Sequence, residues 1–287
     1  MPYEALAQPG ERSSLLRVIL IGGALLATCL IFLDSVASLV AIWNSDGFRH
    51  GYLIPVITAF IFWRERHSVN EAQASPSWIG LGILIVSLWS WLVARLALLQ
   101  VLEHLAILAV FHSLVVAVWG PRVYARAAFP LWYLCLAIPA GIEWIPWLME
   151  FTAWSSTQLL QISGIPVLRE GMYLSLPGGS FEVAESCSGF RYIFSGLALT
   201  ALIAYLDVRS PVKRAAFLVV SVLCFVLLNS VRAALVMAIA SATDMRYLAD
   251  DHIAFGWALF TVLLIALYAA AQRCSDVQDG QLQVDVK

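Results

Sequence analysis

Eight long apolar runs constrain the fold of this 287-residue chain more than any other feature. A helix of roughly 17–25 apolar residues spans the hydrocarbon core of a bilayer. Helices are the default there because backbone groups inside lipid must pair within their own segment. The runs lie near Val18–Trp43, Gly51–Trp63, Trp78–Ala94, Leu102–Trp119, Ala127–Trp147, Cys187–Leu206, Ala215–Ala240 and Ile253–Ala271. They predict an all-α integral membrane protein with about eight transmembrane helices.

The composition agrees with a protein dissolved in lipid. Hydrophobic residues make up 61% of the sequence and charged residues 13%, whereas soluble domains have about 45–50% and about 25%. The 11 Trp, 9 Tyr and 14 Phe suit anchors at the two membrane interfaces. A net charge of -2 gives no basic excess for nucleic acid. We therefore expect neither an ordinary soluble enzyme nor a nucleic-acid-binding protein. The lipid bilayer is an expected partner of the chain.

The cationic residues fall unequally on the two sides of the predicted membrane domain. If all eight runs cross, eleven Lys and Arg lie on one side and three on the other. The positive-inside rule makes the richer side cytoplasmic, with both termini there. The short run at 51–63 is counted as a crossing because, without it, the Lys and Arg residues no longer divide unequally between the two sides. The prediction is a single polytopic membrane domain at residues 18–273 between cytoplasmic tails at 1–17 and 274–287.

The longest outer connection, residues 148–186, divides into two parts. Its first part mixes Trp, Thr and Ser with leucines, which is typical of a helix lying along the interface. In its second part, residues 172–176 and 181–185 alternate apolar and polar side chains around a Pro-Gly-Gly-Ser turn. That pattern predicts a small extracytoplasmic β-hairpin directly before the sixth helix.

Cys187 begins the sixth run, in the sequence ESCSGFR at 185–191. A helix N-terminus and a nearby cation both favour the thiolate form of a cysteine, and Arg191 lies four residues further on. Cysteine is also a common small buried residue, which taken alone is its more frequent role. The tight polar context at the membrane surface favours the nucleophile.

Arg232 lies inside the seventh run, in the sequence NSVR. A charge in mid-membrane costs at least about 2.5–3.5 kcal/mol on insertion scales, so such a residue is a functional candidate by default. Asn229 is three residues earlier on the same helix face, so the two can share a polar pocket. The alternative is that Arg232 extends toward the interface or pairs with a carboxylate such as Asp34.

His252 follows two aspartates at the outer start of the eighth run. In that setting a histidine is often only a solvated loop residue. The predicted topology nevertheless places Cys187, Arg232 and His252 in the same outer half of the membrane. A nucleophile, a cation and an acid/base group at one depth predict a catalytic site, which His50 on the same face could also line.

The other chemistry-bearing residues receive no catalytic role. His104 and His112 in the fourth run are expected to be packed, and five scattered cysteines argue against a disulfide framework or metal cluster. The four cysteines without a role are Cys29, Cys135, Cys224 and Cys274. A metalloprotease helix, a Walker loop and GxGxxG are all missing from the sequence. We expect no metal and no cofactor.

Taken together, four segments resemble the exosortase/archaeosortase family of multi-span membrane cysteine enzymes. They run in the family's order: RHGYLIP at 49–55, ESCSGFR at 185–191, NSVR at 229–232 and HIAFGW from His252. With the eight-span layout, the resemblance covers most of the chain. The combination is specific, whereas each segment alone is weak.

The resemblance implies a function and a site. It implies a thiol protease or transpeptidase with Cys187, Arg232 and His252 as the catalytic set, in the bacterial inner membrane with the site facing the periplasm. The implied partners are exported proteins with a C-terminal sorting signal of Pro-Glu-Pro, an apolar span and a basic end, and an unknown acceptor such as a glycan or lipid, in bacteria that secrete exopolysaccharide. Arg191, Glu185, Asn229 and His50 are supporting or substrate-binding candidates.

Two other classes of protein stay open. A transporter or lipid-handling channel could line a polar path with Arg232, Asp34 and His252. It would tolerate the loss of Cys187 but not of Arg232. A structural component of a polysaccharide-export machine would depend on no single polar residue.

Overall fold

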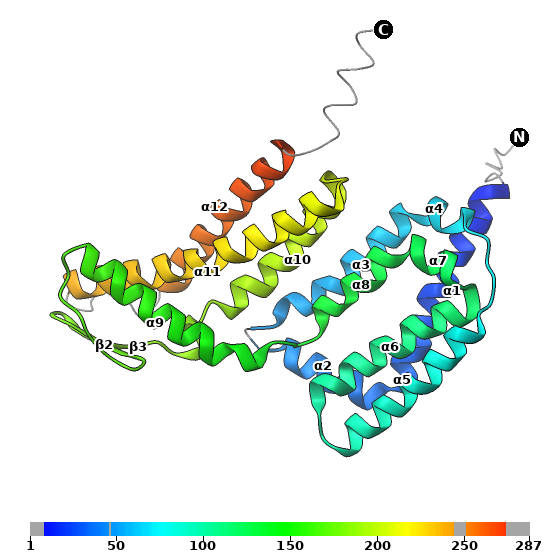
Figure 1. Cartoon of the computed structure of the whole chain (residues 1–287), viewed down its shortest axis with the longest axis horizontal. Coiled ribbons are helices and arrows are strands. Elements are labelled where there is room, and N and C mark those ends of the chain that lie inside the picture. Colours follow the sequence, from blue (N-terminus) through cyan, green and yellow to red (C-terminus); the bar gives the residue numbers. More distant parts are fainter. Residues whose placement is uncertain (1–8, 46, 244–250, 274–287) are drawn as a thin grey trace, which may run out of the picture. The chain divides into compact units, whose positions relative to one another are not determined.

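The computed structural model describes residues 9–45, 47–243 and 251–273, with side chains from residue 15 onward except those of 251–254. The chain divides into two compact units, Met1–Ala140 and Gly141–Lys287. Each unit is mainly helical (Figure 1). The predicted helical class of the fold is therefore confirmed.

The first unit is a set of helices with no strand among its described residues. Two of its long helices, α5 and α6, pack against each other over most of their length. Its elements are α1 Pro9–Ile31, α2 Leu33–Trp43, η1 Arg49–Tyr52, α3 Leu53–Arg64, α4 Arg66–Glu71, α5 Trp78–Leu96, α6 Gln100–Trp119, α7 Pro121–Arg126, α8 Ala128–Tyr133 and η2 Leu134–Ala137.

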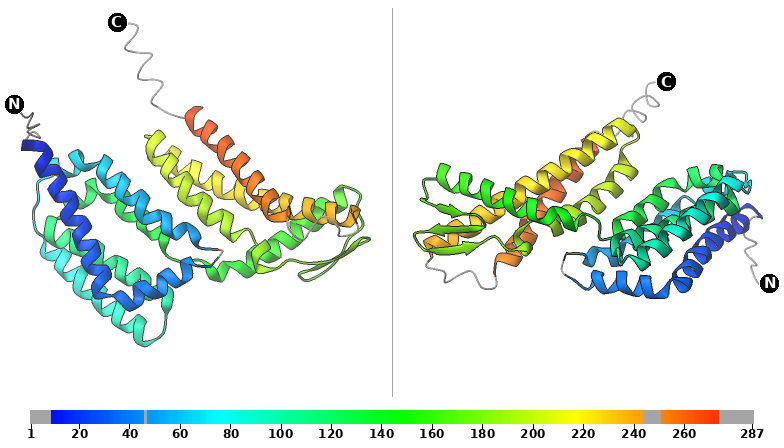
Figure 2. Two further views of the ribbon diagram at one scale, coloured as in Figure 1. Left: turned by 180° about the vertical axis from the view of Figure 1, so that it is seen from behind. Right: turned by 60° about the horizontal axis from the view of Figure 1, so that its bottom comes forward.

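The second unit combines helices with a small sheet. Helices α10, α11 and α12 lie side by side, and α9 packs against α11 (Figures 1 and 2). Its elements are η3 Ile142–Trp144, α9 Ile145–Ile162, β1 Leu168–Glu170, β2 Tyr173–Leu176, β3 Gly179–Glu182, η4 Glu185–Cys187, α10 Phe190–Asp207, α11 Pro211–Ala242 and α12 Asp251–Arg273.

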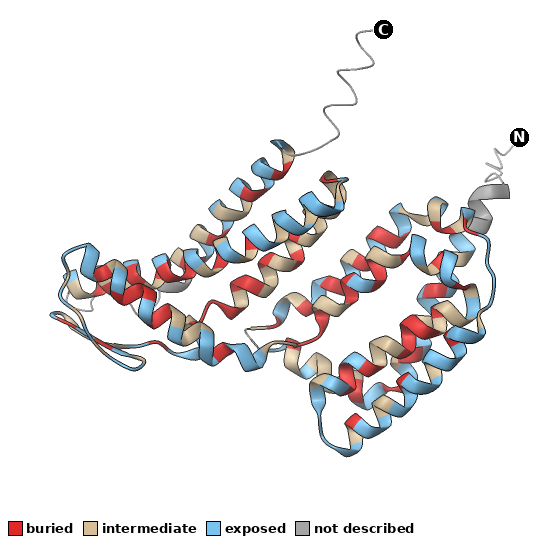
Figure 3. Ribbon diagram, in the orientation of Figure 1, coloured by how far each residue is buried: buried red, intermediate tan, exposed pale blue. Residues whose placement is uncertain are grey.

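Several helices have the length and apolarity to cross a membrane. Among the described residues there are five such helices, or up to seven if each of two bent pairs counts as one span. Helix α3, with 12 residues, is not one of them, although the sequence predicted a crossing there. Ile85, Val86 and Trp89 of α5 are apolar and exposed, as expected for surface that faces lipid chains. The ribbon of α5 is largely in the colour of exposed residues (Figure 3).

The predicted first span is wrong as a single helix. Helix α1 ends at Ile31, and α2 continues after a bend of 94°. The bend lies where Phe32 packs edge-on against Trp91, with ring centroids 4.7 Å apart. Directly after it, the hydroxyl of Ser35 donates to the carboxylate of Glu103 on α6. Tertiary contacts thus break a run that contains neither Gly nor Pro at the bend.

The predicted fifth span is also interrupted. The chain leaves η2 at Ile138, which has the extended backbone that a following proline imposes. Pro139 cannot donate a helical hydrogen bond, and Gly141 has a positive φ of 90°. This Ile-Pro-Ala-Gly sequence is also where the first unit gives way to the second.

The three strands form an antiparallel sheet in the order β1-β2-β3. Strands β2 and β3 make the hairpin, but its second strand is 179–182 where the sequence predicted 181–185, and β1 was not predicted. The apolar side chains of Leu174, Leu176 and Val183 pack with residues of α9 and α11. The sheet therefore covers these two helices next to Cys187.

Helix α9 includes the segment predicted to lie along the interface, and one of its faces is buried against α11. Ser155, Ser156 and Thr157 are all buried. The hydroxyl of Ser155 donates to that of Ser230 at 2.7 Å, and that of Ser156 donates to the Ser230 carbonyl at 3.3 Å. Small polar residues let the two helices approach closely while their hydroxyls stay paired.

Candidate active site

Cys187 lies at the end of the 3₁₀ turn η4, where its N–H donates to the carbonyl of Ala184 at 2.9 Å. Helix α10 begins only at Phe190, after Gly189 in the left-handed conformation. The prediction that Cys187 starts the sixth helix is therefore wrong by three residues. Arg191 belongs to the first turn of α10, so it does not share a helix face with Cys187.

Asn229 of α11 holds this turn in place. Its side-chain amide donates to the carbonyl of Cys187 at 2.9 Å and to the hydroxyl of Thr152 at 3.1 Å. The approach is close because Gly189 has no side chain: a Cβ there would lie 2.5 Å from Cγ of Asn229. The positive φ of Gly189, 81°, further favours glycine. One side chain thus ties Cys187 to both α11 and α9.

Arg232 lies one turn further along α11 and is 8% exposed. Its guanidinium carbon stands 5.4 Å from the ring centre of Tyr192, in cation–π contact. Within the described part of the chain its Nε has no hydrogen-bond partner and the guanidinium has no carboxylate within ion-pair distance. A buried cation without an acceptor is costly, which makes Arg232 a candidate donor to a substrate oxygen.

Cys187 and Arg232 line one cavity of about 200 Å³. Apolar side chains from the hairpin and α11 form most of its wall. The lining residues are Phe181, Glu182, Val183, Cys187, Arg232, Ala233, Val236 and Met237. A thiol and a guanidinium in a mostly apolar cavity form a setting in which charge that develops on a substrate oxygen is strongly stabilised.

His252 is the second residue of α12, and its side chain lies outside the described residues. Its backbone position is one helical turn before Gly256 on the same face. At Gly256 a Cβ would lie 2.4 Å from the hydroxyl of Tyr192 and 2.6 Å from Nε of Arg232. The face of α12 that carries position 252 is thus the face against Arg232.

The other predicted residues are not among those that line this cavity. Glu185 is exposed at the start of η4, and Arg191 is half-buried in α10. His50 lies in the first unit, in η1, where burial lowers the pKa of its imidazole. Its place in the site stays a prediction. Asp34, suggested as a partner of Arg232, has its ion pair with Arg95, at 3.6 Å.

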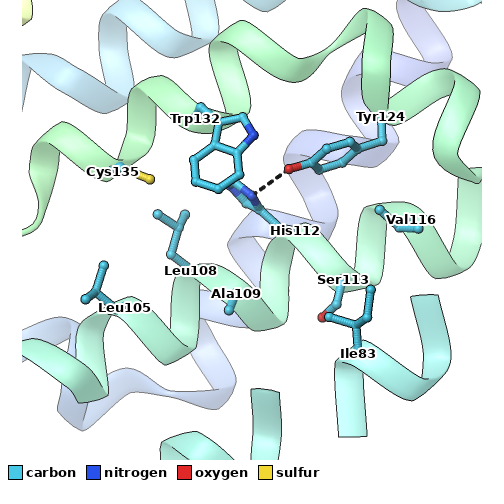
Figure 4. A pocket seen from close by; sticks show the side chains of 10 residues that line it. All are labelled: Ile83, Leu105, Leu108, Ala109, His112, Ser113, Val116, Tyr124, Trp132 and Cys135. Atoms are coloured by element: carbon cyan, nitrogen blue, oxygen red, sulfur yellow. Dashed lines mark hydrogen bonds between the residues drawn. The ribbon is translucent and has the colours of Figure 1, made fainter. Parts of the chain in front are cut away.

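A second pocket, of about 350 Å³, lies within the first unit (Figure 4). His112 lines it, but both ring nitrogens are paired: Nε2 with the carbonyl of Leu131 and Nδ1 with the hydroxyl of Tyr124, each at 3.1 Å. Because a carbonyl only accepts, Nε2 carries the proton and Tyr124 donates to Nδ1. This histidine holds α6 to α7 and α8 and has no free nitrogen for chemistry.

Sequence reasoning missed Thr152, Tyr192 and Gly256. Thr152 carries no local signal, because its role depends on α9 packing against α11. Tyr192 and Gly256 had a signal: one follows directly after the ESCSGFR segment and the other is in HIAFGW, four residues after His252. The i, i+4 spacing was enough to place Gly256 on the face of that histidine.

The fold and the cavity define a class of protein: a multi-pass membrane protein with a thiol and a buried guanidinium at one apolar cavity. Comparison with protein families identifies which one. The model of the transmembrane exosortase family matches residues 42–269, well over half of the chain, so the chain belongs to that family. Membership supports a general role as a transpeptidase or protease in protein sorting, acting on exported substrates. Comparisons with curated proteins and with solved structures find no match.

Proposed function

We propose that this protein is a membrane cysteine transpeptidase or protease that removes the C-terminal sorting signal of exported proteins. The observation that carries the proposal is the shared cavity of Cys187 and Arg232. Family membership supports the sorting role in general. The signal is the Pro-Glu-Pro type with an apolar span and a basic end, and the released protein passes to an acceptor such as a glycan or lipid.

The proposed reaction begins with attack of the Cys187 thiolate on the carbonyl carbon of the scissile peptide bond. A C–S bond forms, and the carbonyl oxygen becomes an oxyanion that Arg232 stabilises. The C–N bond then breaks, and His252, which took the thiol proton, gives it to the leaving amine. An acceptor nucleophile attacks the thioester and restores the thiol, and water in its place gives hydrolysis.

The supporting residues have different tasks in this scheme. Asn229 positions Cys187 through the carbonyl bond at 2.9 Å. Arg191 and Glu185 flank the nucleophile in sequence and orient the approaching substrate. In this proposal His50 lines the site on the outer side of the membrane.

The proposed orientation follows the charge distribution. All eight runs cross the bacterial inner membrane, both termini are cytoplasmic, and the hairpin with Cys187 faces the periplasm. Cysteine accessibility tests this directly. A membrane-impermeant maleimide added to intact spheroplasts should label a single cysteine placed at Ser175, which is exposed on β2, and should not label one placed at exposed Arg209. The reverse pattern would overturn the orientation.

The decisive experiment is co-expression with a secreted protein that carries such a signal, followed by intact-mass measurement of that protein. Loss of the tail should require Cys187 and vanish in Cys187→Ala. Cys224→Ala is the matched control, since Cys224 is also half-buried but does not line the cavity. The mass of the new C-terminus separates hydrolysis from transfer. Tail loss that persists in Cys187→Ala would show that Cys187 is not the nucleophile. A function that is lost in Arg232→Ala but kept in Cys187→Ala would favour a transporter.

A further inference from the structure

Strand β3 lies at one edge of the sheet. Leu174 stands opposite Phe181 and Tyr173 opposite Glu182, and the N–H of Val183 donates to the carbonyl of Met172 at 3.0 Å. In an antiparallel ladder, hydrogen-bonded pairs alternate with pairs that are not hydrogen-bonded. Phe181 therefore directs its backbone groups toward β2, whereas Ser180 and Glu182 direct theirs toward the outer edge.

This outer edge is unpaired within the described ranges of the chain. There, the N–H groups of Ser180 and Glu182 have no backbone partner. The Glu182 carbonyl accepts only the N–H of Ala184, two residues on, at 3.0 Å. An edge strand with unused N–H and C=O groups is a template for another extended chain.

The cavity beside Cys187 borders the same edge. Phe181 and Val183 point toward the core, and Glu182 points to the exposed face, yet all three line the cavity. A cavity lined by residues from both faces of one strand reaches around the edge of that strand. A chain paired with β3 would therefore pass directly beside the cavity that Cys187 and Arg232 share.

We infer that β3 is the docking edge for substrate: an extended segment of the exported protein adds to the sheet as a fourth strand. The inference deepens the proposed function and rests on it. Main-chain hydrogen bonds in such a complex supply affinity for extended peptide of varied sequence, and a side-chain pocket supplies selectivity. Here the pocket is the cavity of about 200 Å³, whose apolar wall and guanidinium suit one small or apolar side chain next to a carbonyl oxygen.

A Pro-Glu-Pro signal is compatible with this register. In an extended chain, residues two apart direct their backbone groups to the same side. The two prolines lack an N–H, so they suit the side away from β3, as prolines do in edge strands. The glutamate between them then offers its N–H and C=O to β3. Backbone methylation of the substrate should therefore act with a period of two residues.

The substrate half of the test uses synthetic peptides with a Pro-Glu-Pro motif, an apolar segment and a basic end, and the full-length protein in nanodiscs. A methyl group on the backbone nitrogen of the motif glutamate, or of the residue directly before the first proline, should lower the cleavage rate at least about tenfold. Methylation of the backbone nitrogen of the second residue before the first proline should change the cleavage rate less than about twofold. Equal effects at adjacent positions, or none, would overturn the docking mode while cleavage of the unmodified peptide keeps the proposed function intact.

The protein half of the test removes one N–H from the outer edge. Ser180→Pro should raise KM about tenfold with a smaller change in kcat, because that nitrogen is not used by β2. Ser175→Ala on β2 is the matched control: it loses the same hydroxyl contact between Ser175 and Ser180 at 3.1 Å but removes no N–H from the edge, and should stay within about twofold. Equal KM values for the two variants, or a changed oligomeric state with unchanged cleavage, would overturn the inference.

Binding separates this inference from the proposed function. The Cys187→Ala variant should bind the unmodified peptide and lose affinity with the same two-residue alternation. If wild type does not cleave the peptide, while the affinity still shows the two-residue alternation, the docking inference is supported and the enzymatic proposal fails. If the peptide neither binds nor is cut, both are overturned.

Discussion

Two arginines on membrane-length helices are held in opposite ways. Arg95 at the end of α5 is 42% exposed in its side chain and pairs with Glu103 at 3.0 Å and Asp34 at 3.6 Å. Arg232 within α11 is 8% exposed, and the described residues give it a tyrosine ring and no carboxylate. A charged side chain that is paired with carboxylates of the same protein needs no ligand to neutralise it. A buried charge without such a carboxylate is costly for folding, so its presence marks a candidate functional residue.

The largest expected effect follows from this contrast. Arg232→Gln should lower the processing rate about 100- to 1000-fold, the usual range for loss of an oxyanion donor. Thermal stability in detergent should stay the same or rise, because the described residues give this buried charge no carboxylate. Rates from intact-mass time courses and unfolding curves measured on the same preparation give both numbers. A stability loss in proportion to the activity loss would make Arg232 a structural residue like Arg95.

The second effect concerns how Cys187 is positioned. Gly189→Ala should lower the rate about 10- to 100-fold, since the new Cβ would lie 2.5 Å from Asn229 and the φ of 81° is strained for alanine. The displaced Asn229 would release the carbonyl of Cys187. Gly171→Ala is the control, because it has a φ of 64° but no atom near its Cβ. Similar rate losses in both variants would assign the effect to backbone strain alone.

The third effect should appear in stability and hardly in rate. Among the residues that the structure describes, Arg95→Gln leaves buried Glu103 with the hydroxyl of Ser35 as its donor. This costs about 1–3 kcal/mol, toward the lower end because Arg95 is partly exposed. The processing rate per folded molecule should stay within about twofold. Asp34→Asn should cost less than Arg95→Gln, since the Asp34 side chain is 88% exposed. A large loss of processing rate in Arg95→Gln would contradict the assignment of Arg95 as a purely structural residue.

The sequence predicted the parts of this molecule that depend on local pattern. Apolar length identified α5, α6, α10, α11 and α12 to within a few residues at most ends. An ionisable residue inside a run was enough to mark Arg232, and helical spacing placed Asn229 beside it.

What could not be predicted depends on contacts between segments distant in sequence. The bend at Phe32 results from Trp91 and Glu103, which are about sixty and about seventy residues away. Thr152 joins the site only through α9. The start of α10 was misplaced because the signal for it is the left-handed Gly189, and sequence reasoning counted Gly189 only as part of a tight polar context. A glycine two residues after a cysteine could have suggested that the helix begins later.

The smallest expected effect tests the link from Arg232 to α12. Gly256→Ala adds a Cβ that would lie 2.4 Å from the hydroxyl of Tyr192 and 2.6 Å from Nε of Arg232. Both are far ends of flexible side chains, so they can move by rotation and the fold should survive. A guanidinium displaced within the cavity should still cost about three- to tenfold in rate. Tyr192→Phe combined with Gly256→Ala should recover part of that loss, because removal of the hydroxyl relieves the closer contact. If the double variant is no better than the single one, the effect runs through α12 itself, where position 252 lies one turn away, and not through Arg232.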